Sequence, residues 1–521
     1  MSNAIDLYSG IGGWTLGMKL SGIGNVASYE WWPEANQTHN LNFETHHKEV
    51  DIRQIDPKRD LNFDKKIDFV VGSPPCTQFS YANRGGNGDI SDGLIDIYKF
   101  LEVVEHLQPK YWAMENVPRV AKILEEEIKN GALKRFENLV KHIIIVDTAD
   151  YGTPQNRKRM IAGNFPLALF YGYKTKILPV TLGNVLNSLN ENIIVDPNYG
   201  YKIERKKITE LENEADLTPQ ELRINKDAKT YHPIYNNMSF PDRLDRPSRT
   251  VTATCTRVSR ESIIIKSENG YRRLNVRERG VIQGFPITYQ FYGKTVNAKF
   301  KMIGNAVPPV LTYYIFQSML ETPITKVRSL KESSYLHEQP KFKAYKSKIG
   351  LPIAKYPSTR KFQFAVPNLR FGSGVRFELS NNLNIEKNLW SFKFFYGNSK
   401  KIKELKLNGE LIEKLPQILN ITDYKLLEDE VKVISKKYTD INSKVLQEKW
   451  TKSTPNMEAF IFLDDVGLSI SRILQNSKLD SISSIVVKDL INDDSKKLID
   501  KKNEILVGLF FLSILNTKII S

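Results

Sequence analysis

The sequence predicts an α/β protein with a doubly wound sheet, because short apolar runs alternate with amphipathic stretches over its first third. A glycine-rich turn follows the first apolar run, and Pro74-Pro75 follows the third. In this βαβα order the carboxyl ends of the strands meet at one edge, where open α/β sheets bind ligands. Strands are expected at Ile5–Ser9, Val26–Glu30, Ile67–Val71, Tyr111–Glu115, Ile143–Asp147 and Met160–Asn164, and helices at Trp14–Ser21, Tyr98–Leu107 and Ala121–Val140.

The chain of 521 residues is longer than one ordinary domain, and its pattern changes at several points. Regular alternation stops near residue 165, and turns, charges and scattered tyrosines follow. We therefore expect a first domain in two parts, 1–165 and 248–325, with a smaller domain inserted at 166–247. A basic linker at 326–360 leads to an α+β C-terminal domain at 361–521 whose role the sequence does not indicate.

The later parts of the chain contain one expected strand and several apolar or helical stretches. The period-two stretch Ser248–Thr254 predicts a strand, and helical spacing occurs at Asn275–Gln283 and Val310–Leu320. Pro308-Pro309 suits the start of the latter helix. The apolar stretch Ile505–Leu515 is too short to cross a bilayer, so we interpret it as a buried helix or strand.

The composition favours a soluble protein of a reducing compartment. Two cysteines, Cys76 and Cys255, are too few for a disulfide framework or a four-ligand zinc site. The N-terminus runs directly into an expected strand without a signal-peptide pattern, so we expect a cytoplasmic location and no membrane contact. The net charge of +16 suits a polyanionic partner, although a lysine-rich proteome is the alternative explanation.

Four residues are candidates for catalysis at the carboxyl edge of the sheet. Cys76 follows a strand and the rigid Pro74-Pro75, and its thiolate would be a strong nucleophile. Glu115 ends another strand at the same edge, where a carboxyl beside a thiol suggests an acid and a nucleophile. Arg157 and Arg159 offer donors for a carbonyl or a phosphate. Taken singly, each has a structural alternative: a buried cysteine, a surface acid or a solvated basic loop.

A second group of residues suggests a cofactor pocket. The run Asp6–Gly13 is a glycine-rich turn between a strand and a helix, where the backbone can approach a ligand closely. Glu30 closes the next strand, at the place where an acid commonly binds ribose hydroxyls. Trp31 and Trp32 beside it can stack on a purine, and Asp51-Ile52 offers an acceptor and an apolar face. The glycine pattern is G-x-G-G, which does not favour a nicotinamide cofactor.

In this order, the motifs resemble those of the DNA cytosine-5 methyltransferases of bacterial restriction–modification systems. The resemblance runs from Ile5 to about Leu320, and Pro74-Pro75-Cys76 with Glu115-Asn116-Val117 is its most specific part. It implies a Rossmann-like, S-adenosylmethionine-dependent methyltransferase domain, with 166–247 as its target-recognition domain. The other motifs are the glycine turn, Glu30, Asp51-Ile52, Gln155-x-Arg157-x-Arg159, Arg273-Leu274-x-x-Arg277-Glu278, Gly284-Phe285-Pro286 and Gly304-Asn305-Ala306-Val307.

The resemblance implies a covalent mechanism at a cytosine that has been flipped out of duplex DNA. Cys76 would attack C6, Glu115 would hydrogen-bond or protonate N3, and Arg159 would bind O2. Arg157 would support the site. The methyl group would come from S-adenosylmethionine, and no metal is required.

The resemblance also implies the residues of the cofactor site. Asn305 lies far along the chain, so the helix near Val310–Leu320 should pack back onto the first domain. The stretch Ser80–Asp92 would close over the flipped base. The residues expected to bind S-adenosylmethionine are Asp6, Tyr8, Gly10, Gly12, Gly13, Glu30, Trp31, Asp51, Ile52, Pro75 and Asn305.

Several alternatives stay open at the level of sequence. The tRNA-methylating branch shares the catalytic set, and a DNA-binding protein on an inactive methyltransferase scaffold is a second alternative. We expect a monomer that acts on double-stranded DNA, with a cognate restriction endonuclease in the same system. The C-terminal domain would grip DNA, dock a protein or act as a nuclease, since Glu404-Leu405-Lys406 and Glu430-Val431-Lys432 have the acid-x-Lys form of some metal-dependent nucleases.

Overall fold

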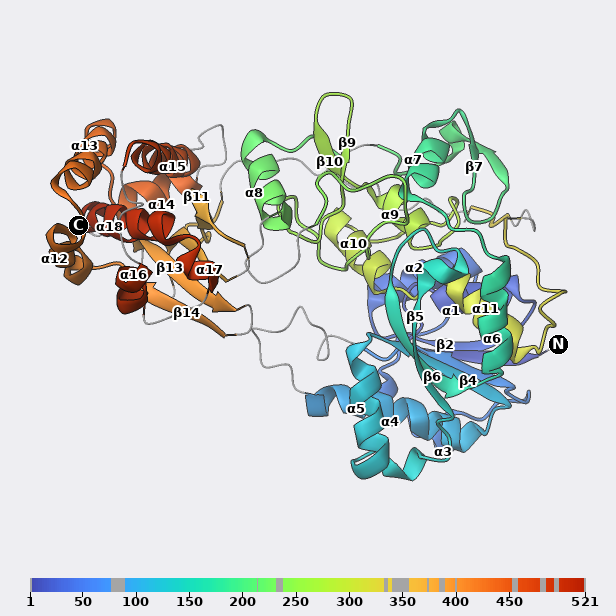
Figure 1. Ribbon diagram of the computed structural model, residues 1–521. Coiled ribbons are helices and arrows are strands. Elements are labelled where there is room, and N and C mark those ends of the chain that lie inside the picture. Colours follow the sequence, from blue (N-terminus) through green and yellow to red (C-terminus); the bar gives the residue numbers. More distant parts are fainter. Residues whose placement is uncertain are drawn as a thin grey trace. The chain divides into compact units, whose positions relative to one another are not determined.

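The described residues belong to two units of the chain (Figure 1). The first unit comprises Met1–Asp216 with Phe240–Gly350, and the second comprises Leu217–Ser239 with Leu351–Ser521. The computed structural model describes residues 2–75, 90–212, 214–230, 238–331, 336–339, 356–372, 374–383, 389–398, 401–451, 458–477, 484–491 and 496–519. No helix in these ranges is long and apolar enough to cross a membrane.

A six-stranded sheet with the order β2-β1-β3-β4-β6-β5 forms the centre of the first unit. Neighbouring strands from β2 to β4 are parallel, whereas β6 runs antiparallel to both β4 and β5. This arrangement confirms the predicted α/β class, with an antiparallel hairpin at one edge. The strands are β1 (Asn3–Leu7), β2 (Gly24–Tyr29), β3 (Phe69–Gly72), β4 (Tyr111–Asn116), β5 (His142–Asp147) and β6 (Lys158–Asn164).

Strands β1, β3, β4 and β6 of this sheet contribute side chains to two hydrophobic cores, one on each face. In β3, Phe69 and Val71 belong to one core, and Val70 belongs to the other. Because successive side chains of a strand point to opposite faces, this alternation requires helices on both sides of the sheet. Figure 1 shows α4 and α5 covering the face opposite to α1 and α11.

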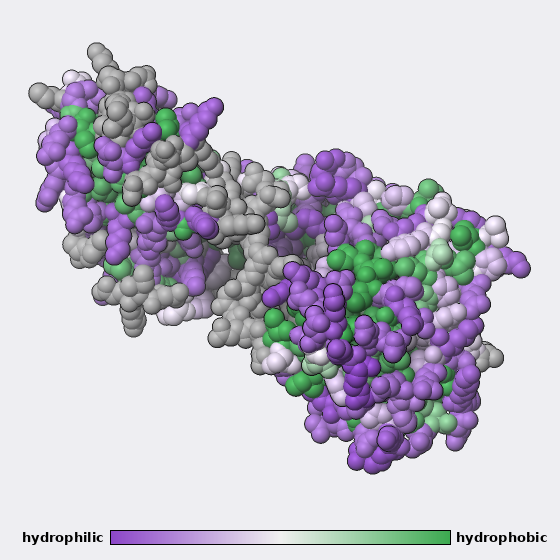
Figure 2. Space-filling model, turned by 60° about the horizontal axis from the view of Figure 1, so that its bottom comes forward, coloured by the Kyte–Doolittle hydropathy of each residue, from purple (hydrophilic) through white to green (hydrophobic). Residues whose placement is uncertain are grey.

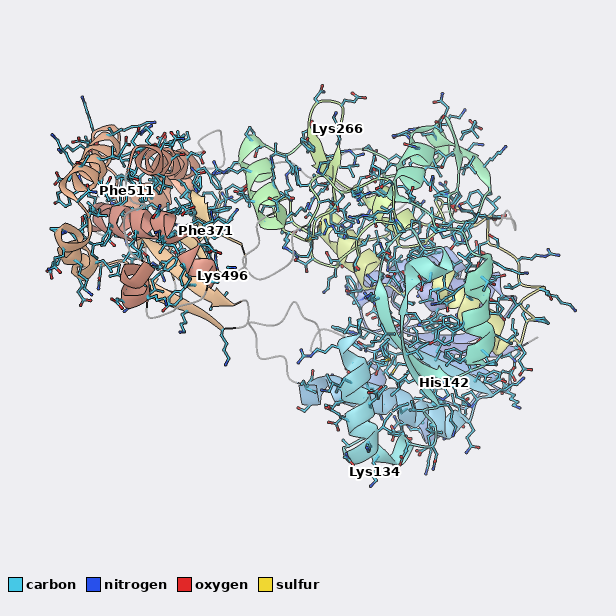
Figure 3. All side chains as sticks on the ribbon, viewed as in Figure 1. Lys134, His142, Lys266, Phe371, Lys496 and Phe511 are labelled. Carbon is cyan, nitrogen blue, oxygen red and sulfur yellow. The ribbon has the colours of Figure 1, made fainter. Side chains whose placement is uncertain are left out.

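The helices of the first unit surround this sheet, and two short hairpins accompany them. The helices are α1 (Gly13–Leu20), α2 (Pro33–Phe43), α3 (Pro57–Asp60), α4 (Ile90–Leu107), α5 (Arg119–Asn130), α6 (Leu167–Tyr173), α7 (Leu182–Asn190), α9 (Val276–Ile282), α10 (Val296–Asn305) and α11 (Pro309–Met319), with the 3-10 turns η1 (Ile52–Gln54), η3 (Lys134–Phe136), η4 (Thr148–Tyr151), η5 (Lys174–Lys176) and η6 (Arg205–Lys207). The hairpins pair β7 (Ile193–Val195) with β8 (Lys202–Glu204) and β9 (Ile264–Lys266) with β10 (Tyr271–Arg273), and Lys266 lies at the second of these in Figure 3.

Helix α11 packs back onto α1, as the sequence predicts. Thr312 Oγ1 donates a hydrogen bond to the carbonyl oxygen of Gly13 at 2.9 Å. A Cβ atom on Gly17 would lie 2.3 Å from Thr312 Oγ1, so glycine is needed for this close approach. The last described helix of the first unit therefore packs against the helix that follows the glycine-rich turn.

The predicted helix Ala121–Val140 is too long. Helix α5 ends at Asn130, and a 3-10 turn at Lys134–Phe136 follows. Glu127 ends the helix by accepting a hydrogen bond from the backbone N–H of Ala132 at 2.9 Å through its side chain. The apolar residues beyond this point are buried by the turn and do not extend the helix.

The predicted strand Ser248–Thr254 is also wrong. Ser248 makes only an isolated bridge with Gln155 among the described residues, and no ladder extends from it. Side chains bind the backbone of this segment instead: Gln155 Oε1 accepts from Val251 N at 3.0 Å, and Arg157 Nη1 donates to Val251 O at 2.9 Å. The period-two pattern therefore marks an extended segment that is held by side chains.

The second unit contains an antiparallel sheet with the order β11-β12-β13-β14 and a set of helices. Helix α18 contributes an almost continuous buried surface, which confirms that Ile505–Leu515 is a buried helix, and Phe511 marks this helix in Figure 3. The elements are β11 (Gln363–Arg370), β12 (Arg376–Asn381), β13 (Trp390–Asn398), β14 (Lys401–Lys406), α12 (Gly409–Ile418), α13 (Ile421–Lys437), α14 (Ser443–Thr451), α15 (Glu458–Asn476), α16 (Ser484–Ile491), α17 (Lys496–Ile499) and α18 (Lys502–Ile519).

Helix α8 (Pro219–Thr230) belongs to the second unit, although the chain reaches it from within the first. Arg223 on α8 donates from Nη2 to Asp464 Oδ1 on α15 at 2.8 Å. Its guanidinium carbon lies 4.4 Å from the centre of the Phe460 ring. The structure thus divides the expected inserted domain, 166–247, between the two units.

Hydrophilic side chains dominate the visible faces of both units (Figure 2).

Candidate active site

Glu115 and Arg159 form an ion pair at the carboxyl end of β4. Arg159 Nε lies 2.7 Å from Glu115 Oε1. Glu115 is near the end of β4, and Arg159 is on β6, which pairs with β4 in antiparallel orientation. Both side chains are nearly buried, with exposed fractions of 7% and 12%. The ion pair holds a carboxylate and a guanidinium together at the edge where the sequence predicts catalysis.

The chain leading to Cys76 is anchored beside this ion pair. Cys76 itself and most of the predicted covering stretch Ser80–Asp92 lie outside the described residues. Trp14 Nε1 donates to Ser73 Oγ at 3.0 Å, and Asn116 Nδ2 donates to the carbonyl oxygen of Pro74 at 3.1 Å. Asn116 follows Glu115 directly in sequence. The backbone that precedes the candidate nucleophile is therefore tied to the strand that carries Glu115.

Arg157 has a different environment from Arg159. Its buried guanidinium donates to the carbonyl oxygens of Val251 at 2.9 Å and Gly304 at 2.7 Å, and Nη2 also lies 3.3 Å from the oxygen of Ala306. The last two carbonyls flank Asn305. These contacts place Arg157 as a support for the segments around Val251 and Asn305.

Five of the predicted cofactor residues line one cavity of about 280 Å³. The indole of Trp31 is 63% exposed beside it, which leaves a ring face open for stacking. The predicted residues that line the cavity are Tyr8, Trp31, Asp51, Ile52 and Pro75. The sequence motifs do not indicate the other described residues that line the cavity, which are Arg53, Asp92, Gly93 and Asp96.

Glu30 is hydrogen-bonded to the glycine-rich turn. Glu30 Oε2 accepts from the backbone N–H of Gly10 at 2.8 Å, and Oε1 accepts from the backbone N–H of Trp32 at 2.8 Å. Burial raises the pKa of Glu30, although these backbone donors oppose the shift. Gly12 has a φ of 88°, and a Cβ there would lie 2.3 Å from the ring of Phe43. The turn therefore needs glycine for both its conformation and its packing.

Six of the predicted cofactor residues do not line the cavity: Asp6, Gly10, Gly12, Gly13, Glu30 and Asn305. Asp6 is fully buried, and its Oδ2 accepts from Thr15 Oγ1 at 2.8 Å. Gly13 packs against Val307, whose carbonyl oxygen would lie 2.2 Å from an added Cβ. Asn305 is exposed at the end of α10. Asp6 therefore contacts α1 through Thr15, and Gly13 permits the close approach of Val307.

Arg53 connects the two walls of the cavity. Its Nη1 lies 2.7 Å from Asp92 Oδ1, and its Nη2 lies 2.7 Å from Asp96 Oδ2. Asp92 and Asp96 are four residues apart, so they share one face of α4. That spacing is the only signal in the sequence for this network, and it does not identify the partner.

Comparison with known proteins identifies the family of this chain. Residues 2–321 match the family model of the C-5 cytosine-specific DNA methylases. The chain belongs to this family. It is therefore a DNA cytosine-5 methyltransferase, and DNA is its substrate.

The methylase relatives cover about three fifths of this chain. Type II methyltransferase M1.HphI of Haemophilus parahaemolyticus is 30% identical over 338 residues, which cover 61% of this chain and 86% of the relative. Type II methyltransferase M.FnuDI of Fusobacterium nucleatum is 28% identical, with 63% and 97% covered. A solved structure of a DNA modification methyltransferase from an Escherichia coli prophage is 22% identical, with a TM-score of 0.46 and coverages of 62% and 99%.

The methylase family does not account for the acid-x-Lys sequences of the second unit. Glu430 accepts from Arg472 Nε at 2.9 Å and Nη2 at 2.8 Å. Glu404 pairs with Lys393 on the neighbouring strand at 3.1 Å. Within the described ranges, no group of three or more His, Cys, Asp or Glu side chains is arranged to hold a metal ion.

Proposed function

We propose that this methyltransferase transfers a methyl group from S-adenosylmethionine to C5 of a cytosine in a specific duplex sequence, as the modification enzyme of a restriction–modification system. The observation that carries the proposal is the buried Glu115–Arg159 ion pair beside the anchored approach to Cys76. The relatives named as Type II methyltransferases support the biological setting.

The chemistry proposed at cytosine uses three side chains. The Cys76 thiolate adds to C6, and the electron pair of the C5–C6 double bond then makes C5 nucleophilic. Glu115 binds the ring at N3 and Arg159 donates to O2, so the charge that develops on the ring is stabilised where it forms. When bound, S-adenosylmethionine supplies the methyl group from its sulfonium. Loss of the C5 proton to a base then expels the Cys76 thiolate and restores the ring.

The residues around the cavity fit S-adenosylmethionine. Trp31 offers an exposed indole face for adenine, and the carboxylate of Asp51 offers an acceptor for an exocyclic amino group. Asp51, Asp92 and Asp96 make the wall predominantly acidic, which suits a sulfonium cation. Glu30 would bind the ribose hydroxyls, and the backbone N–H groups of Gly10 and Trp32 hold its carboxylate.

DNA recognition and assembly complete the proposal. The base must leave the helix, because a thiol in a crevice cannot reach a cytosine that is stacked in a duplex. Residues 166–247 would read the target sequence in the major groove. The protein would act as a cytoplasmic monomer, and a cognate restriction endonuclease would cut the same sequence when it is unmethylated.

A covalent trap tests the proposed mechanism. Bisulfite sequencing of DNA from a host that expresses the chain would first identify the modified sequence. A duplex with 5-fluorocytosine at that position should then become linked to the protein through Cys76 in the presence of S-adenosylmethionine. Cys76→Ser should abolish the adduct while retaining cofactor binding. An unmodified genome, or an adduct at another residue, would overturn the proposal.

A further inference from the structure

Arg53 makes a multidentate contact with the beginning of α4. Its Nε and Nη2 donate to Asp96 Oδ1 and Oδ2 at 3.0 and 2.7 Å. Its Nη1 donates to Asp92 Oδ1 at 2.7 Å, and Nη2 also donates to the carbonyl oxygen of Asp92 at 3.0 Å. A planar guanidinium that binds in this way fixes both distance and orientation. Arg53 therefore sets the separation between the η1 turn and α4.

Asp96 needs such a cationic partner because it is buried. Its exposed fraction is 4%, and a buried carboxylate without a partner is costly. Tyr8 Oη lies 3.2 Å from Asp96 Oδ1, so the same carboxylate also holds the Tyr8 ring. Hydrogen bonds from Arg53 to Asp96 and Asp92 raise the pKa of Arg53, so the guanidinium keeps its charge at every pH of practical interest.

The contacts of Arg53 surround the cavity assigned above to the methyl donor. Asp51 and Ile52 line one side, and Asp92, Gly93 and Asp96 line the other. The backbone N–H of Arg53 donates to Asp51 Oδ1 at 3.0 Å. One residue thus orients the Asp51 carboxylate through its main chain and the α4 wall through its side chain.

We propose that Arg53 is a positioning residue for the methyl-donor pocket, where it holds the η1 turn and the start of α4 at the separation that S-adenosylmethionine requires. This inference rests on the proposed function, because it assumes that the cavity binds that cofactor. Arg53 acts through Asp51, Asp92 and Asp96 rather than through a contact with the reacting atoms.

A positioning role and a simple charge role predict different selectivities between the two ligands. Among the described residues that line the cavity, Arg53 is the one Lys or Arg, whereas three are aspartates. Removing Arg53 makes the pocket more negative, and charge alone would then favour the sulfonium cofactor over its neutral demethylated product, S-adenosylhomocysteine. If the pocket wall is displaced, the affinity for both ligands should fall equally, because the two ligands share every group except the methyl.

Calorimetry of the full chain with both ligands tests the proposal. Arg53→Met should lower the affinity for S-adenosylmethionine and for S-adenosylhomocysteine by the same factor of about 10 or more, since misplacement of a pocket wall is costly. Arg53→Lys should recover part of the affinity, because an ammonium cannot reproduce the bidentate contact. The KM for S-adenosylmethionine should rise by the same factor, whereas kcat at saturating cofactor should fall by a smaller one. Arg59→Met is the matched control, because Arg59 pairs with Asp60 on an exposed surface.

Asp92→Asn provides a second variant in case Arg53→Met does not fold. The Asp92 side chain is 38% exposed, so this change removes one arm of the contact without leaving a buried charge. Asp92→Asn should lower the affinity for both ligands by the same factor, which should be smaller than the factor for Arg53→Met. Unchanged affinities in Arg53→Met and Asp92→Asn, or a selective gain for S-adenosylmethionine, would overturn the inference while leaving the proposed function intact. Failure of the wild type to bind either ligand would overturn both.

Discussion

Arg159 reaches Glu115 across the antiparallel pair of β6 and β4, with 2.7 Å between Nε and Oε1. The two side chains come from segments more than forty residues apart, yet they form one nearly buried unit. A charge-assisted contact of this length fixes the carboxylate in one orientation. The two groups assigned to N3 and O2 of cytosine are therefore presented together.

Glu115→Gln should slow methyl transfer by about 10²- to 10⁴-fold, the usual contribution of a positioned acid. The amide keeps the size of the side chain but loses the negative charge and the capacity to donate a carboxyl proton. Cofactor affinity should not change, because Glu115 does not line the cavity. Single-turnover assays with labelled cofactor measure the rate, and Glu126→Gln on the exposed face of α5 is the control. A rate close to that of the wild type would contradict the assigned role.

Trp31→Ala should raise the KM for S-adenosylmethionine by about 5- to 150-fold, because stacking of a base on an aromatic ring contributes about 1–3 kcal/mol. The fold should be unaffected, since the side chain is 63% exposed. Trp31→Phe should retain most of the affinity. Equal effects of Ala and Phe would show that the ring face does not bind the cofactor.

Asp6 should make the stability of the fold depend on pH. Burial raises its pKa from 3.8 to about 8, although hydrogen bonds from Thr15 act in the opposite direction. Because the folded-state pKa is raised, the stabilisation is complete below the unfolded pKa and is lost as pH rises through about 8. Relative to Asp6→Asn, the wild type should lose on the order of 1 kcal/mol per pH unit between about pH 5 and 7.

Denaturant unfolding at several pH values measures this effect of Asp6. Asp60→Asn is the control, because a hydrogen bond from Arg59 lowers the pKa of Asp60 to about 2, below the window. Parallel stability curves for the wild type and Asp6→Asn would show that Asp6 is ionised in the folded protein.

Gly17→Ala should destabilise the first unit by about 1–3 kcal/mol, as overpacking of a close contact does. The added Cβ would lie 2.3 Å from Thr312 Oγ1 and 2.9 Å from its Cβ, so α1 and α11 must separate. Gly409→Ala is the matched control, since nothing lies within 4 Å of a Cβ at that position in α12. Thermal unfolding distinguishes the two, and equal melting temperatures would contradict the packing argument.

Arg223→Met should destabilise the second unit by about 1 kcal/mol, because it removes an ion pair and a cation–π contact that are partly exposed. The methionine keeps the apolar contact with Phe460, so the loss of stability measures the contribution of the guanidinium charge. Limited proteolysis should then cut 217–239 faster. Lys432→Met is the control, because Lys432 pairs with Asp429 at an exposed surface. Unchanged proteolysis would show that α8 does not depend on Arg223.

Local patterns account for the parts of the fold that the sequence predicts correctly. The strands of the central sheet are visible because their apolar residues are continuous and end in turns. Helix α2 escaped prediction because its residues are mostly polar and several are buried by hydrogen bonds, as when Asn42 Nδ2 donates to the carbonyl oxygen of Gln290 at 2.8 Å. The segment Ser248–Thr254 failed for the opposite reason, since its alternation is real but its backbone partners are the side chains of Gln155 and Arg157.

The amino-acid sequence by itself determined the class of the sheet, the chemistry at the ends of its strands and the resemblance to a methylase family, because these depend on short-range periodicity and on motifs of a few residues. Tertiary structure alone decided that Arg53 meets Asp96, that Arg157 supports Asn305 and that α8 joins the second unit. Such contacts join segments that are far apart in the chain. The sequence contains many arginines and carboxylates in similar local surroundings, and only the packing of whole helices and strands decides which of them meet.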